Sequence, residues 1–166
     1  MKNIFIGLMM AILSLGTTAV YAQKTANSVK STQEQQLALK ELTDLFFAAA
    51  KTGNQEVINE FLKHGFPVNT KNHAGFTPLM MAAYYGHQPI VTTLLENGAD
   101  RCIRDNKGNT ALMGAMFKLE WSIVKQLRKV DCDVNAKKQG LKTSEEFAKV
   151  LGQEAQLKKI AESYKD

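Results

Sequence analysis

Residues typical of catalytic centres are scarce in this chain of 166 residues. Its three histidines are His64, His73 and His87, and none has the spacing from a nucleophile or a second ligand that catalytic and metal motifs require. A glycine-rich phosphate loop is also missing. The carboxylates are scattered along the surfaces of expected helices. The sequence therefore predicts a protein that is not an enzyme, and it gives no reason to expect a cofactor or a metal.

Long apolar runs are confined to the beginning of the chain. Lys2 precedes an apolar run at residues 4–15, and Val20-Tyr21-Ala22 has the small-residue pattern of a signal peptidase site. Glycine, serine and threonine dilute the run, so a retained membrane anchor is the weaker alternative. Because no cysteine lies near the cleavage site, lipidation there is not expected. We expect a bacterial periplasmic or secreted protein with a signal peptide at 1–22, cleavage after Ala22, no stable membrane insertion after cleavage, and a flexible linker at 23–30.

Residues 73–106 have the pattern of one complete structural unit. Thr77 is placed to cap a helix whose first turn contains Pro78, and Gly86 is placed to end that helix in the left-handed conformation. Apolar residues then recur at helical spacing up to Gly98. Helices this short are not stable alone in water, so the unit must pack against similar units.

The same pattern recurs every 33 residues. The small residue inside the first helix of each unit appears as Ala49, Ala82, Ala115 and Ala148. The cap threonine recurs as Thr77, Thr110 and Thr143, and an aliphatic residue of the second helix as Ile58, Val91, Val124 and Leu157. The small residue lets neighbouring helix pairs approach closely, and the aliphatic residues fill the space within each pair.

These features resemble the ankyrin repeat family. The G-x-T-P-L start, the A-A pair, the G-H-x-x-I-V-x-x-L-L run and the G-A-D ending all lie within residues 75–100, and the period is the one typical of that family. The resemblance implies an all-α fold, an ankyrin-repeat solenoid of about four helix-turn-helix repeats with short hairpin loops. The domain is expected at 31–166, with repeats at about 42–72, 73–106, 107–139 and 140–166. A helix from Gln33 and the polar last repeat are expected to cap the two ends.

Two departures from the family pattern concern single positions. Met80 and Met113 replace a histidine that usually ties its loop to neighbouring backbone, so that polar link is in doubt. Leu119 stands where the other repeats have a turn glycine. Positive φ costs leucine about 1 kcal/mol or more, so either the turn changes shape or it stores strain.

The resemblance also implies that another protein binds to the concave face, formed by the hairpin tips and the ends of the first helices. We carried the family's concave-face positions over to this chain and added its single tryptophan. The residues selected in this way are Lys71, Asn72, Tyr84, Tyr85, Arg101, Arg104, Lys107, Phe117, Lys118 and Trp121. Tyrosine, tryptophan and arginine dominate interface energetics. The alternative for the tyrosines is that they only cover the stack, with their hydroxyls in water.

Charge is uneven along the chain. Residues 101–166 carry 14 lysines and arginines against nine acids, whereas residues 23–100 carry six lysines against seven acids. The basic half suits a partner with an acidic surface, although such charges also serve simply to solvate helices. Nucleic acid is not expected as a partner of an exported protein, and a monomer is expected.

Three functions are compatible with an exported binding module. The first is an accessory of a periplasmic enzyme, since the chain resembles small exported ankyrin proteins associated with catalase. The second is an immunity protein that neutralises a periplasmic toxin. The third is a haem or small-molecule carrier that uses His73 and the methionines, for which adaptable core packing is the simpler interpretation.

The two cysteines of the exported chain leave two alternatives open. Cys102 and Cys132 lie near the ends of consecutive repeats but are offset by three residues from equivalent positions. Equivalent positions in stacked repeats are about 10 Å apart, beyond the Cα separation of roughly 7 Å that a disulfide tolerates. The offset either shortens or lengthens that gap, so a disulfide and two separately packed thiols both remain possible.

Overall fold

The computed structural model describes residues 32–134 and 136–164, so the predicted signal peptide and linker lie outside the described residues. The chain divides into two compact units, Met1–Leu42 and Thr43–Asp166. In the first unit residues 32–42 are helical. Within residues 32–134 and 136–164 the regular elements are helices, with no strand. The all-α prediction is confirmed. The predicted cap role of the helix that starts near Gln33 stays a prediction.

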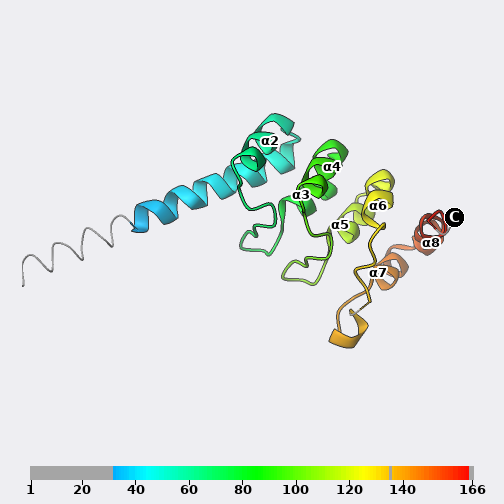
Figure 1. The fold of residues 1–166 in the computed structure, drawn as a ribbon. Coiled ribbons are helices and arrows are strands. Elements are labelled where there is room, and N and C mark those ends of the chain that lie inside the picture. Colours follow the sequence, from blue (N-terminus) through cyan, green and yellow to red (C-terminus); the bar gives the residue numbers. More distant parts are fainter. Residues whose placement is uncertain (1–31, 135, 165–166) are drawn as a thin grey trace, which may run out of the picture. The chain divides into compact units, whose positions relative to one another are not determined.

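The second unit is a row of helix pairs (Figure 1). The first pair joins helical residues 43–52 to α2 (Gln55–Lys63). The next three pairs are α3 (Pro78–Tyr84) with α4 (Gln88–Glu96), α5 (Ala111–Phe117) with α6 (Trp121–Leu127), and α7 (Ser144–Leu151) with α8 (Glu154–Glu162). A short 3-10 helix, η1 (Lys137–Gln139), lies in the loop before α7.

Helices of the same kind pack against each other along this row. The first helices α3, α5 and α7 contact one another in that order, and so do the second helices α2, α4 and α6. The alanines and aliphatic residues that the 33-residue period singles out are buried in one core. We call the surface formed by α3, α5 and α7 the first-helix face.

The predicted cap residues begin three of the first helices. The hydroxyls of Thr77, Thr110 and Thr143 accept hydrogen bonds from backbone N–H groups three residues later. In the first of these caps the sulfur of Met80 accepts a hydrogen bond from the Thr77 N–H, with a separation of 3.4 Å. The methionine thus supplies a weak form of the polar link that its substitution for histidine places in doubt.

The turn between α5 and α6 keeps the left-handed shape despite its leucine. Leu119 has a φ of 63°, close to the 78° of Gly86 in the preceding repeat. The chain-reversing hydrogen bonds also correspond, since Glu120 N–H donates to Ala115 and His87 N–H donates to Ala82, each with a separation of 2.9 Å. Of the two sequence alternatives, the structure shows the strained turn.

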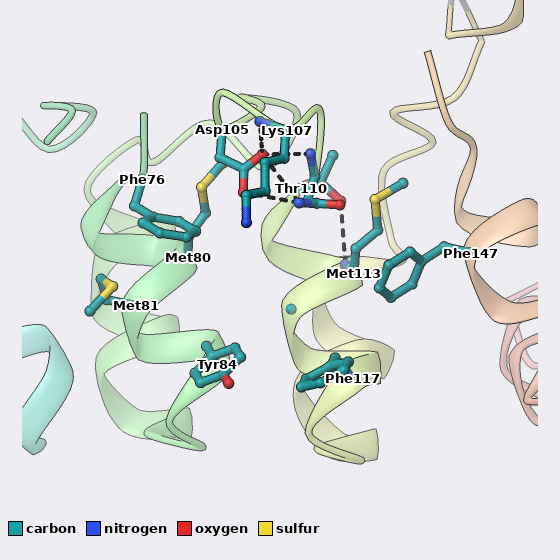
Figure 2. Close-up of a pocket in the computed structure, with 12 residues that line it drawn as sticks. Phe76, Met80, Met81, Tyr84, Asp105, Lys107, Thr110, Met113, Phe117 and Phe147 are labelled. Atoms are coloured by element: carbon teal, nitrogen blue, oxygen red, sulfur yellow. Dashed lines mark hydrogen bonds between the residues drawn. The ribbon is translucent and has the colours of Figure 1, made fainter. Parts of the chain in front are cut away.

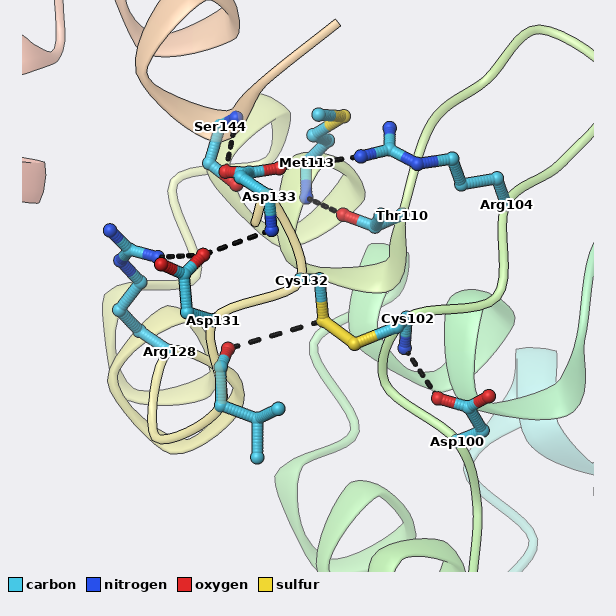
Figure 3. Close-up of a disulfide and its surroundings, with 11 residues drawn as sticks. Asp100, Cys102, Arg104, Thr110, Met113, Arg128, Asp131, Cys132, Asp133 and Ser144 are labelled. Carbon is cyan, nitrogen blue, oxygen red and sulfur yellow. Dashed lines mark hydrogen bonds and ion pairs between the residues drawn. A yellow bond between two sulfur atoms is a disulfide. The ribbon is translucent and has the colours of Figure 1, made fainter. Parts of the chain in front are cut away.

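A disulfide joins the loops that follow α4 and α6 (Figure 3). The Cα atoms of Cys102 and Cys132 are 5.0 Å apart. The three-residue offset therefore shortens the spacing of equivalent positions enough for a bond. Near the disulfide, the Asp133 carboxylate links the loop after α4 to the start of α7. It accepts hydrogen bonds from the Arg104 side chain and from the Ser144 backbone N–H.

Candidate functional site

Three aromatic side chains form a continuous strip at the ends of α3 and α5. The ring centroids of Tyr85 and Tyr84 are 5.2 Å apart, and those of Tyr84 and Phe117 are 6.2 Å apart with nearly parallel planes. Phe117 is 56% exposed and Tyr85 42% exposed. Lys51 lies over the Tyr85 ring and Lys118 over the Tyr84 ring, with Nζ 5.6 and 5.3 Å from the centroids. We call Tyr84, Tyr85 and Phe117 the aromatic strip.

A cavity of about 330 Å³ opens beside the strip on the first-helix face (Figure 2). Its walls come from α3, α5 and α7 and from the loops before α3 and α5. The lining residues are mostly apolar: Phe76, Met80, Met81, Tyr84, Asp105, Lys107, Asn109, Thr110, Met113, Gly114, Phe117 and Phe147. We call this space the Gly114 cavity.

The cavity exists because one repeat lacks a side chain where its neighbours have large ones. Met81, Gly114 and Phe147 occupy equivalent positions, 33 residues apart. A Cβ atom on Gly114 would lie 3.8 Å from Cβ of Tyr84, an ordinary contact, so a larger side chain would extend into the free volume. Glycine inside a helix costs about 1 kcal/mol relative to alanine. The cavity is thus bounded by two large side chains with a helical glycine between them.

The two charged residues of the lining, Asp105 and Lys107, differ in whether their side chains are available to contact a ligand. Asp105 is buried, with 8% of the residue exposed, and its carboxylate accepts hydrogen bonds from the backbone of Lys107 and from the backbone and side-chain amides of Asn109. It therefore holds its own loop. The Lys107 side chain is exposed and carries the positive charge of the lining. Met80 and Met113 are buried packing residues of the core.

Comparison with known protein families identifies the repeats of this chain. The family model described as ankyrin repeats in three copies matches residues 8–105 and 45–138, more than half of the chain. The chain belongs to the ankyrin repeat family. Ankyrin repeats mediate interactions between proteins and form a family of non-enzymatic interaction modules.

Two relatives match part of this chain. The ankyrin repeat protein PA3287 of Pseudomonas aeruginosa is 35% identical over 54 residues, which cover 32% of this chain and 32% of the relative. The E3 ubiquitin-protein ligase XBAT33 of Arabidopsis thaliana is 49% identical over 43 residues, which cover 26% of this chain and 8% of the relative. The chain thus spans about a third of the first relative and less than a tenth of the second.

The hairpin residues selected from the ankyrin pattern mostly hold the loops together. Arg104 donates hydrogen bonds to the carbonyls of Gly108 and Lys142, at 2.6 and 2.9 Å, and pairs with Asp133. Lys71 donates in turn to the Arg104 carbonyl, and Asn72 accepts from two backbone N–H groups in its own turn. These contacts give the three residues a structural task, and their part in partner binding stays a prediction.

The remaining predicted residues fall into two groups. The first group lies at the candidate site. Its members in and beside the aromatic strip are Tyr84, Tyr85, Phe117 and Lys118, and its members in the lining of the cavity are Lys107, Tyr84 and Phe117. Trp121 begins α6 and packs partly buried against the core, and Arg101 is partly buried in the loop after α4. Neither Trp121 nor Arg101 is among the lining residues of the Gly114 cavity.

Sequence reasoning missed the centre of the site. It did not select Gly114 or Phe147, and it named Met81 only among the methionines of the carrier alternative, although the register shared by these three positions is visible in the sequence. It also missed Lys51 at the end of the strip.

Two searches of the described residues, 32–134 and 136–164, complete the site description. In this part of the chain, no cluster of three or more histidine, cysteine or acidic side chains is arranged to hold a metal ion. Over the same residues, no helix combines the length and the apolar character needed to cross a membrane.

Proposed function

We propose that this chain is an exported, non-enzymatic binding protein that holds another protein against its first-helix face. The observation that carries the proposal is the aromatic strip, in which two exposed rings flank a third. Monomeric proteins rarely leave contiguous large apolar side chains in water without a use. Tyrosine and phenylalanine supply large contact areas at low conformational cost, which suits them to an interface.

The disulfide supports the export part of the proposal. Disulfides persist in oxidising compartments such as the periplasm and are rare in the bacterial cytosol. The bond between Cys102 and Cys132 agrees with the signal peptide expected at residues 1–22. Cleavage after Ala22 is tested by intact-mass measurement of the protein recovered from the periplasm or the medium. A mass that retains residues 1–22 contradicts it.

The binding part is tested by capture from periplasmic extract. The full chain with a C-terminal tag is compared with a Tyr85→Ala/Phe117→Ala variant. Val130→Ala is the matched control, because Val130 is an exposed apolar residue outside the strip. We expect one protein to bind the wild type and the control and to be lost with the double variant. Equal capture by all three refutes the strip as the binding site.

The identity of the captured protein then decides the biological task. A catalase or another periplasmic enzyme indicates an accessory role, and a toxin indicates an immunity protein. Retained thermal stability of the double variant shows that loss of capture reflects the lost side chains. The strip residues Tyr85 and Phe117 are exposed and do not belong to the buried core, so their removal should leave the core intact.

A further inference from the structure

Three lysine side chains lie in or next to the lining of the Gly114 cavity. Lys107 belongs to the lining itself. Lys118 lies over the ring of Tyr84, and Lys142 lies over the ring of Phe147 with Nζ 5.4 Å from the centroid. Both of these aromatic residues line the cavity. An apolar hollow is therefore bordered by lysine side chains from three separate segments.

These lysines have no acidic partner within the protein as described. Among residues 32–134 and 136–164, the ion pairs within 4.0 Å do not include Lys107, Lys118 or Lys142. The one carboxylate in the lining, that of Asp105, is occupied by hydrogen bonds from its own loop. With three lysines against this one carboxylate, these side chains carry a net positive charge, which is complementary to carboxylates on a binding partner.

The size of the cavity limits what it holds. At about 330 Å³ it lies at the lower end of the range of about 300–1,000 Å³ typical of sites that enclose whole small molecules. It is also continuous with the exposed aromatic strip through Tyr84 and Phe117. This combination fits a single side chain inserted from a segment that continues along the strip. Interfaces commonly concentrate their binding energy in such anchors.

On the basis of the proposed function, we propose that the Gly114 cavity receives one large apolar side chain from an acidic segment of the partner protein. Gly114 makes room for that side chain, and Lys107, Lys118 and Lys142 pair with the carboxylates beside it. The proposal explains why a helix former is absent from the middle of α5, although glycine there weakens the helix.

A random peptide library displayed on phage tests the occupant directly. The full chain with its disulfide intact is the target, and selected peptides are then synthesised and their Kd values measured. We expect the peptides to share one leucine, isoleucine, methionine, phenylalanine or tryptophan flanked by aspartate or glutamate. Enrichment of peptides without acidic residues, or of none at all, overturns the proposal.

Two substitutions at one position separate the cavity from the surrounding surface. Gly114→Leu fills the volume, whereas Gly114→Ala adds only a methyl group at ordinary contact distance from Tyr84. We expect Gly114→Leu to bind the peptides about 30-fold more weakly than the wild type, as for the loss of a hot spot, and Gly114→Ala to lose much less affinity, because it takes up less of the volume. Equal binding by both variants refutes the cavity as the binding site.

The lysines are tested by charge reversal. Lys107→Glu, Lys118→Glu and Lys142→Glu are each expected to weaken binding, and the reversal of Lys158, on α8, is the matched control. Added salt should also raise the Kd for the wild type, because screening weakens exposed charge pairs. Binding that ignores all three reversals overturns the acidic part of the proposal.

A second measurement does not depend on how the leucine variant folds. In protein labelled with ¹³C at the methionine methyls, peptide binding should shift the signals of the lining residues Met80, Met81 and Met113. Met116 is fully buried outside the lining and serves as the internal reference. Shifts absent from all three lining methionines contradict insertion. If capture of a partner still depends on Tyr85 and Phe117 in that case, the proposed function stands and only the cavity proposal fails.

Discussion

The strained turn at Leu119 leads to a prediction in which the backbone conformation alone decides whether glycine or alanine gives the larger free energy of unfolding. Its φ of 63° lies in the left-handed region, and the turn is fixed by the N–H groups of Leu119 and Glu120, which donate to Met116 and Ala115. The side chain is 59% exposed, so it contributes little burial. Replacing Leu119 by alanine keeps the strain, whereas replacing it by glycine removes the strain.

The expected magnitude follows from two opposing terms. Relief of the left-handed conformation is worth about 1–2 kcal/mol. The additional freedom of glycine in the unfolded chain costs about 0.4–1 kcal/mol. Leu119→Gly should therefore be more stable than Leu119→Ala by about 0.5–1 kcal/mol. At Gly114, which is helical and lacks a positive φ, the order reverses, and alanine should be more stable than glycine by about 1 kcal/mol.

Urea and thermal unfolding followed by circular dichroism measure both comparisons. For a chain of this length a change of 1 kcal/mol corresponds to a shift in Tm of about 2–4 °C. The m-value should stay constant across the four proteins, which are the wild type, Leu119→Ala, Leu119→Gly and Gly114→Ala. If Leu119→Ala is the more stable of the two Leu119 variants, the left-handed conformation is not a source of strain in this turn.

Two further predictions concern covalent and electrostatic links. The disulfide closes a loop with a sequence separation of 30, which restricts the unfolded chain by about 3.6 kcal/mol of conformational entropy. The variant Cys102→Ser/Cys132→Ser should therefore lower the free energy of unfolding by about 3.6 kcal/mol in urea titrations. A decrease of less than about 1 kcal/mol contradicts this stabilising role of the disulfide. The pKa of Glu146 is lowered from its ordinary 4.5, chiefly by the Thr143 N–H that donates to it and then by the Thr143 hydroxyl. The contribution of the Glu146 carboxylate to stability is therefore present above pH 4.5 and lost as the pH falls through the lowered pKa. The difference in Tm between wild type and Glu146→Gln should shrink on acidification. A difference in Tm that stays constant with pH shows that the ionised carboxylate does not stabilise the fold.

Most of the fold was predictable because its signals are local. A cap threonine, a turn glycine and an alanine inside a helix each act within one repeat or on the next repeat, so the 33-residue spacing of Thr77, Thr110 and Thr143 predicted three helix starts. The sequence also marked Leu119 as the position where the turn either changes shape or stores strain, since the other repeats have glycine there. Whether the turn would keep its shape required the hydrogen bonds of the folded chain.

The candidate site was only partly predictable, because its parts come from three repeats. The sequence selected Tyr84, Tyr85 and Phe117 by position, but the cavity depends on the space that Gly114 leaves between side chains of α3 and α7. Arg104 illustrates the opposite case. Its position at a hairpin predicts a partner contact, but in the structure its guanidinium is occupied by Gly108, Lys142 and Asp133.

The repeat period and the resemblance to the ankyrin family follow from the amino-acid pattern alone. The helix caps and the buried layers follow from it as well, because they depend on contacts between residues that are close in the chain or one period apart. The tertiary structure decided which loop positions meet, and so it brought Cys102 and Cys132 to a Cα separation of 5.0 Å. It also decided that an absent side chain at Gly114 becomes a cavity, since free volume is a property of all the neighbours together and not of any one residue.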